Sequence, residues 1–173
     1  MKKLLIILIT FFLHIKVLAC DYQYILNDKC INELYSQAQI AIKNKEIKLI
    51  RDSRGLILRI KFDDPIEEYF RKNEDVYKEI EYFLAKIENS AIIEVHIENF
   101  PSVKLKKLKK WEFSTIMANQ IEAFIVTPKG SVNQNRIHSI GYGEFLPEKN
   151  TSNNGGKKSN RIDIIVLCNV SGE

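Results

Sequence analysis

The stretch RIHSIGYGEFLPEKNTSNNGGKKSNRIDIIVL, residues 136–167, decides the fold. It begins with strand-forming residues (136–140), continues through Gly141-Tyr142-Gly143 and a polar loop rich in Asn, Gly and Lys, and ends on the run 161–167. That last run is mostly apolar on both faces, as expected of a strand in the interior of a sheet. The stretch therefore predicts two strands of one sheet, joined by a glycine turn and a long polar loop.

Strand and helix patterns alternate in the region before this stretch. Residues 56–62 alternate along the chain like a strand, and Asp63-Asp64-Pro65 ends the pattern. Asn73 is positioned to cap a helix, with Glu74 and Asp75 in its first turn. The expected elements, in order, are a lead-in helix over residues 31–45, a strand at 56–62, a helix over 73–89, a strand at 91–97, a helix over 111–126, and strands at 136–140 and 161–167. This order predicts an α/β fold: a β-α-β-α-β-β two-layer sandwich with two helices on one sheet, preceded by the amphipathic lead-in helix.

Apolar side chains recur at helical spacing in all three expected helices. The stripes are Ile31, Leu34, Tyr35, Ala38 and Ala41/Ile42 in the first, Val76, Ile80, Phe83, Leu84 and Ile87 in the second, and Phe113, Met117, Ile121, Phe124 and Ile125 in the third. In the strand at 91–97, the residues expected to face the core are Ile93, Val95 and Ile97.

The N-terminus has the pattern of a secretory signal. Lys2 and Lys3 precede the apolar run 4–13, and small residues follow near Ala19. The run is about half as long as the ~20 apolar residues that a membrane-spanning helix needs. An uncleaved signal anchor is the alternative, because further apolar residues up to position 18 lengthen the stretch.

Residues 17–20, Val-Leu-Ala-Cys, resemble a bacterial lipobox, in which the cysteine becomes the lipidated first residue. We therefore predict lipidation of Cys20, and plain cleavage after Ala19 is the alternative. The predicted organisation is a lipoprotein-type signal peptide (1–19), a tether and lead-in helix (20–53, with the tether itself at 21–30), one folded domain (54–168) and a C-terminal tail (169–173).

The charge of the chain argues against a nucleic-acid partner. It has 26 Lys and Arg residues against 22 Asp and Glu residues, a formal net charge of +4. Three of the lysines, and no acid, lie within residues 1–19, so the rest of the chain is nearly neutral. The basic balance is therefore a property of the signal peptide rather than of a surface that binds nucleic acid.

Besides Cys20, the chain contains Cys30 and Cys168. An exported protein could join them in a disulfide, and two separate thiols fit the sequence equally well. Their spacing resembles no metal site, and we predict neither a metal nor a cofactor.

Catalytic patterns are missing from the sequence, which contains no G-x-S-x-G motif and no phosphate-binding loop. His96 and His138 each fall on an expected strand, where structural or surface roles are the simplest interpretation. Ser114 lies near a helix start, where serine more often caps than attacks. The basic run KLKKLKK (104–110) could contact anionic lipid or glycan, or form a solvated turn. We predict that the protein is not an enzyme.

Together these segments resemble the OmpA-like (OmpA/MotB) peptidoglycan-binding domain. The family pattern R-I-x-x-x-G-Y-G-E-x-x-P-x-x-N, followed by a loop and N-R-R-I/V-D/E-I, is matched by Arg136, Ile137, Gly141, Tyr142, Gly143, Glu144, Pro147, Asn150, Arg161, Ile162, Asp163 and Ile164. Of the family's tandem arginines only the second is kept, because the pair here is Asn160-Arg161. Upstream, residues 94–99 (EVHIEN) stand where the family has E-G-H-T-D-N, and residues 111–118 (WEFSTIMA) where it has W-E-L-S-x-x-R-A. The resemblance covers residues 54–168.

The resemblance implies a groove that holds the diamino acid of the peptidoglycan stem peptide without chemistry. In the family an aspartate and an arginine bind the charged groups of the diamino acid. Here the aspartate is replaced by Glu98, which keeps the charge, and the arginine by Met117, which keeps no donor. By resemblance, Asn99, Ser114 and Arg161 also line the groove.

Two interpretations follow from these replacements. In the first, the domain still binds the wall, with a ligand such as ornithine or lysine that lacks the distal carboxylate of diaminopimelate. In the second, the groove is degenerate and the domain binds proteins of an envelope or flagellar-motor-associated complex. A groove collapsed around Met117 would favour the second interpretation, and an open groove with Glu98 exposed the first. A stator subunit is excluded for this chain alone, because residues 4–19 contain no acid to accept protons.

We therefore expect a periplasmic protein anchored to a membrane by its lipid, the outer membrane rather than the inner one. Its expected function is to tie that membrane to the peptidoglycan, with other envelope proteins as further partners.

Overall fold

The computed structural model describes residues 27–62, 73–99, 108–127, 130–146 and 160–168. The expected signal peptide, the predicted lipidation site Cys20 and the C-terminal tail lie outside these residues. Within the described parts of the chain, no helix combines the length and the apolar character needed to cross a membrane.

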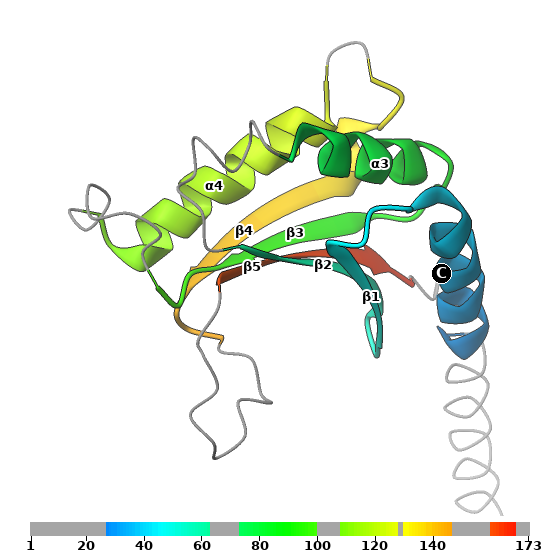
Figure 1. The fold of residues 1–173 in the computed structure, drawn as a ribbon, viewed down its shortest axis with the longest axis horizontal. Coiled ribbons are helices and arrows are strands. Elements are labelled where there is room, and N and C mark those ends of the chain that lie inside the picture. The colour runs from blue at the N-terminus through cyan, green and yellow to red at the C-terminus, as the bar shows by residue number, and fades with distance from the viewer. Residues whose placement is uncertain (1–26, 63–72, 100–107, 128–129, 147–159, 169–173) are drawn as a thin grey trace, which may run out of the picture.

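In these residues, five strands form one mixed sheet (Figure 1). The strands are β1 (Ile47–Asp52), β2 (Gly55–Phe62), β3 (Ala91–His96), β4 (Ile137–Gly143) and β5 (Asn160–Leu167). Their order across the sheet is β1-β2-β5-β3-β4, and all neighbours are antiparallel except β3 and β4. The last strand of the chain thus lies inside the sheet and is buried on both faces, which confirms the prediction from its apolar pattern.

Helices α3 (Glu74–Ala85) and α4 (Lys110–Ile125) cover the same face of the sheet (Figure 1). Another helix spans residues 27–41, and the short 3₁₀ helix η2 (Gln134–Arg136) precedes β4. This arrangement is the predicted two-layer α/β fold, and every predicted helix and strand is present, with β1 added to them.

β1 is not among the predicted elements. It forms an antiparallel hairpin with β2 in which Asp52 pairs with Gly55. Gly55 has a φ of +148°, and a Cβ there would lie 2.0 Å from the carbonyl oxygen of Val166. Only Ile47 and Leu49 of β1 pack toward the core. So short an alternation does not stand out in a sequence.

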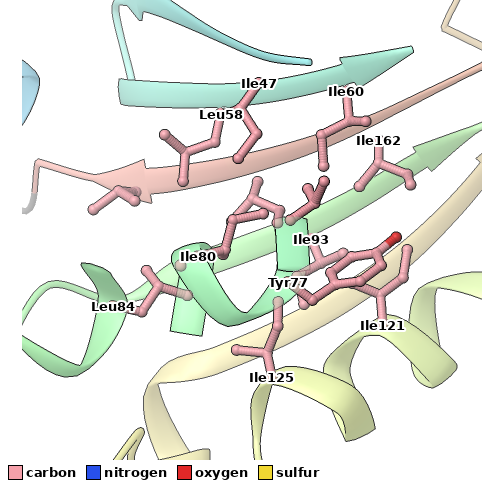
Figure 2. Close-up of a cluster of buried hydrophobic side chains, with 14 of the residues drawn as sticks. Ile47, Leu58, Ile60, Tyr77, Ile80, Leu84, Ile93, Ile121, Ile125 and Ile162 are labelled. Carbon is pink, nitrogen blue, oxygen red and sulfur yellow. The ribbon is translucent and has the colours of Figure 1, made fainter. Parts of the chain in front are cut away.

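The apolar core lies between the sheet and the helices, and Figure 2 shows Ile80 of α3 and Ile121 and Ile125 of α4 around Ile93 of β3. The predicted stripe of α3 is buried throughout. In α4 the exception is Phe124, which is 38% exposed. Burying one large aliphatic side chain contributes about 1.5–3 kcal/mol, so this shared core is what holds the helices on the sheet.

Gly141-Tyr142-Gly143 forms the last part of β4 rather than following the strand. The predicted turn is present at the strand end, where the backbone nitrogen of Phe145 donates to the carbonyl oxygen of Tyr142, but of the two glycines only Gly143 belongs to it. The glycines are needed because α4 lies directly against the strand. A Cβ on Gly141 would lie 2.2 Å from the backbone nitrogen of Thr115, and one on Gly143 would lie 2.8 Å from that of Trp111. Gly143 also has a φ of +53°, which favours glycine.

Helix 27–41 packs on the same core and is fixed there by a disulfide. Leu34 and Ala38 are buried in the core, and Cys30 is bonded to Cys168, directly after β5. The sequence left the pairing of these cysteines open, and the structure shows the bond. Residues 27–30 are helical, so the prediction of a tether over 21–30 is wrong for these four residues, and the helix ends at residue 41 rather than 45.

The two ends of α3 are stabilised differently from the prediction. Asn73 precedes the helix as expected, but its side chain makes no capping hydrogen bond. Beyond the other end, Arg136 donates hydrogen bonds to the carbonyl oxygens of Leu84 and Asn89. Burial lowers the pKa of the Arg136 guanidinium, whose hydrogen-bond partners are neutral. A cation from another segment thus stabilises the negative end of the helix dipole.

Replacing both Cys30 and Cys168 by serine is expected to lower the free energy of unfolding by about 2–5 kcal/mol. The reason is the large loop that the disulfide closes, whose two cysteines are separated by 138 positions in the sequence. Chemical denaturation of the oxidised protein and of the double variant measures the difference. A reductant should lower the stability of the wild type to that of the variant and leave the variant unchanged; equal stability of the two proteins would contradict the prediction.

Gly141→Ala is expected to lower the free energy of unfolding by about 3 kcal/mol, because the added methyl group would meet the backbone of α4. Ser139→Ala on the same strand is the control, since its hydroxyl bonds only to the exposed Asn119 side chain. The control should stay within about 0.5 kcal/mol of the wild type in thermal unfolding. Equal unfolding temperatures for the two variants would show that α4 can move away from β4.

Candidate functional site

Glu98, Asn99 and Arg161, three of the predicted ligand-binding residues, come together at one end of the sheet. β3 ends at His96, which pairs with Arg161 at the start of β5 and with Gly143 at the end of β4. Glu98 and Asn99 follow directly after β3. The antiparallel pairing of β3 with β5 is therefore what joins these distant parts of the chain.

The side chain of Asn160 holds the backbone at this end of the sheet. Its Oδ1 accepts hydrogen bonds from the backbone nitrogen of Glu98 at 3.0 Å and from that of Asn99 at 2.9 Å. Asn160 is only 1% exposed, so these bonds lie out of competition with solvent. One oxygen thus satisfies two consecutive amides and fixes the chain that leaves β3.

Glu98 and Arg161 carry opposite charges that are close together but not hydrogen-bonded. Arg161 Nη1 lies 3.7 Å from Glu98 Oε1, and each side chain is 6% exposed. The other guanidinium nitrogens are used: Nε donates to Asp163 Oδ2 at 3.1 Å, and Nη2 to the carbonyl oxygen of Leu146 at 2.7 Å. Arg161 Nη1 is buried without a hydrogen-bond acceptor, and no described residue donates a hydrogen bond to the Glu98 carboxylate.

Ser114 and Met117 are fully buried. The Ser114 hydroxyl donates to the carbonyl oxygen of Trp111 at 2.9 Å and accepts from the backbone nitrogen of Gly143 at 2.8 Å, so it connects α4 to β4. Met117 lies in the apolar core. In this conformation neither side chain presents a surface to a ligand, and their roles as ligand contacts stay predictions from the resemblance.

A network of buried charges extends from Arg161 along the sheet face opposite α3 and α4. Asp163 accepts hydrogen bonds from Arg59 Nε at 2.6 Å and Nη2 at 2.8 Å, in addition to the bond from Arg161. Glu94 accepts from Arg54 at 2.9 Å. Burial lowers the pKa of Arg54, but its hydrogen bonds and ion pairs with the acids at positions 52 and 94 outweigh this effect, and the pKa is raised overall.

His96 lies within this network. Its Nε2 is 3.5 Å from Glu94 Oε2 and 3.9 Å from Asp163 Oδ2, and its ring stacks on Tyr142 with the centroids 5.2 Å apart. Both ring nitrogens are buried without a hydrogen-bond partner. His138, on the neighbouring strand, is exposed.

 Glu94, His96 and Asp163 each offer a ligand atom, and these atoms lie within 4.8 Å of one another. However, Arg54 and Arg59 already pair with the two carboxylates, so a divalent ion would have to displace a guanidinium. We therefore interpret the cluster as a charge network that supports the end of β3.

Neither the contacts of Asn160 nor the charge network is predicted from the sequence. The available signal was the presence of Arg59, Glu94 and Asp163 in the middle of otherwise apolar strands, where charged residues are seldom buried unless they are paired. Which of them pair depends on the register of β2, β5 and β3, and the sequence does not give that register.

No known family model and no curated protein matches the sequence. Solved structures do match its fold. A MotB-like protein from Desulfovibrio vulgaris is 16% identical, with a TM-score of 0.57, over 87% of this chain and 99% of that one. The periplasmic domain of MotB from Helicobacter pylori is 20% identical, with a TM-score of 0.55, over 72% of this chain and 81% of that one. The cell wall anchor of the T6SS from Pseudomonas aeruginosa is 14% identical, with a TM-score of 0.51, over 78% and 96%.

These likenesses confirm the fold that the resemblance to OmpA-like domains predicts. In each case the match extends over more than two thirds of both chains. At such low identities the comparison concerns the fold, and the function has to be argued from the site itself.

Asp163→Asn is expected to lower the free energy of unfolding by about 3 kcal/mol, because it leaves the guanidiniums of Arg59 and Arg161 without their buried carboxylate. Glu74→Gln is the control, since its ion pair with Lys78 is exposed and should contribute at most about 0.5 kcal/mol. Chemical denaturation compares the two variants. Similar small losses in both would mean that the buried network adds no more than a surface pair.

Proposed function

We propose that this chain is an exported, lipid-anchored envelope protein that binds peptidoglycan without covalent chemistry and ties a membrane to the cell wall. The binding end is formed by Glu98, Asn99 and Arg161. Cys20 carries the lipid, and the domain lies in the periplasm, anchored in the outer membrane rather than the inner one. The protein has no catalytic role in this proposal.

The observation that carries the proposal is the state of Glu98 and Arg161. Their facing charged atoms are 3.7 Å apart and nearly buried, and among the described residues Arg161 Nη1 finds no acceptor and the Glu98 carboxylate no donor. Charged groups in this state are costly for a protein to keep. A ligand that presents an ammonium group to Glu98 and an acceptor to Arg161 would satisfy both, and the diamino acid of a stem peptide presents such groups.

The fold supports the same proposal. One protein that shares it is a cell wall anchor, and another is the periplasmic domain of MotB. The resemblance of the sequence to peptidoglycan-binding domains points in the same direction and includes Asn99 and Arg161 among its matching positions.

A second candidate function is a protein–protein interaction module whose groove no longer binds the wall. The burial of Met117 in the core and the 8% exposure of Glu98 favour it, since this is the closed arrangement that a degenerate groove predicts. At the same end of the domain, Trp111 is 46% exposed and Phe145 72% exposed, and such side chains are common in protein interfaces.

Co-sedimentation of the full chain, in mild detergent, with purified peptidoglycan sacculi tests the proposal. Glu98→Gln is expected to weaken retention more than about tenfold, because it removes the charge that accepts the ligand ammonium group. Glu33→Gln is the matched control, since Glu33 is exposed on helix 27–41, away from the binding end. Thermal unfolding of each variant separates a binding loss from a folding loss.

Sacculi with diaminopimelate and with ornithine or lysine form the two arms of this experiment. Because Met117 supplies no donor for a distal carboxylate, the ornithine or lysine type is expected to bind at least as well. Retention on diaminopimelate sacculi alone would disprove the idea of a changed ligand. If neither type retains the wild type, wall binding is wrong and the interaction module is the function to pursue.

A further inference from the structure

We propose that Asn160 is a positioning residue for the wall ligand, because it holds the turn Glu98–Asn99 in the conformation that keeps the Glu98 carboxylate beside Arg161. This inference rests on the proposed function and identifies what organises its binding end. Asn160 itself is buried and does not contact the ligand.

The geometry assigns this role to a single atom. Asn160 Oδ1 accepts from the backbone nitrogens of two consecutive residues, at 3.0 and 2.9 Å. Both amides belong to the segment that has just left β3, where the described strands no longer pair with it. Without this acceptor the two amides would lack a hydrogen bond, and the turn could adopt other conformations.

The position of Asn160 in the sheet makes it a fixed support. It is the first residue of β5 and pairs with Phe62 of β2. Arg161, the next residue, points toward Glu98 and Asp163. Two consecutive residues of one strand therefore lie against Glu98: Asn160 bonds to its backbone nitrogen, and Arg161 lies beside its carboxylate.

The residue type is specific for this task. The resemblance places an arginine at position 160, and a guanidinium has five donors but no acceptor. An arginine could not bind these two amides, so the support by Asn160 is a property of this chain rather than of the family pattern. Because Asn160 accepts from the amides of Glu98 and Asn99, these two amides are not available to the ligand.

Three variants of the full chain test the inference. Asn160→Leu keeps the volume and removes the acceptor, and Asn160→Asp keeps both the shape and the acceptor. Asn119→Leu is the matched control, since Asn119 Oδ1 accepts a hydrogen bond from Ser139 at 3.0 Å in an exposed position on α4. The readouts are sacculus retention, thermal unfolding, and hydrogen exchange of the amides of residues 98 and 99.

We expect Asn160→Leu to weaken sacculus binding about tenfold and to speed exchange of both amides at least about tenfold. Asn160→Asp should restore slow exchange and keep binding within about threefold of the wild type, and Asn119→Leu should change neither readout. A merely structural role would lower the unfolding temperature of Asn160→Leu without faster exchange confined to these two amides.

Two outcomes separate the inference from the proposed function. If the wild type is retained on sacculi and Asn160→Leu is retained equally well, the positioning role is overturned while wall binding stands. If the wild type is not retained at all, the proposed function fails, and the role of Asn160 in ligand binding fails with it.

Discussion

The insertion of β5 between β2 and β3 is the interaction on which the rest of the structure depends. β5 is the last strand of the chain, yet it forms both central ladders of the sheet, with Gly55–Phe62 on one side and Ala91–His96 on the other. Until it is in place, the β1–β2 hairpin and the β3–β4 pair have no hydrogen bonds to each other. Such non-local pairing makes folding slow, since the whole chain has to be present before the sheet can close.

The register of that insertion also creates the end of the sheet at which Glu98, Asn99 and Arg161 meet. Side chains alternate along β5, so Ile162 and Ile164 enter the core while Arg161 and Asp163 lie on the other face. There Asp163 meets Arg59 of β2 and lies near His96 of β3. A shift of one residue would move the charges into the apolar core and the isoleucines onto the face with the charged side chains, so one register satisfies both kinds of side chain.

Much of the fold can be predicted from the sequence because its signals are local. The stripe of α3 and the apolar run of β5 are periodic within a single element, and both are found as expected. The features that were missed require knowledge of the tertiary structure. Arg59 and Asp163 are 104 residues apart, so their pairing cannot be read from local pattern. Gly141 looks like a turn residue, whereas its actual role is to admit the backbone of α4.

The same distinction applies to the candidate site. The resemblance named Glu98, Asn99 and Arg161, and the sheet brings them together. The resemblance also placed Met117 in the groove, but its side chain lies in the apolar core. Methionine fills irregular apolar space as readily as it lines a groove. Asn160 was noted only as a departure from a pattern, because its role depends on the amides that end β3.

The disulfide between Cys30 and Cys168 has a mechanical consequence. It attaches helix 27–41 to one end of β5, whereas Arg161 stands near the other end, about 20 Å away along the strand. Tension between the two ends would act along the strand axis, so the hydrogen bonds to β2 and β3 would be sheared together rather than opened one after another. Without the disulfide, a pull on the N-terminal side would first separate the apolar contacts of the helix. With it, the covalent bond would transmit the force directly to β5.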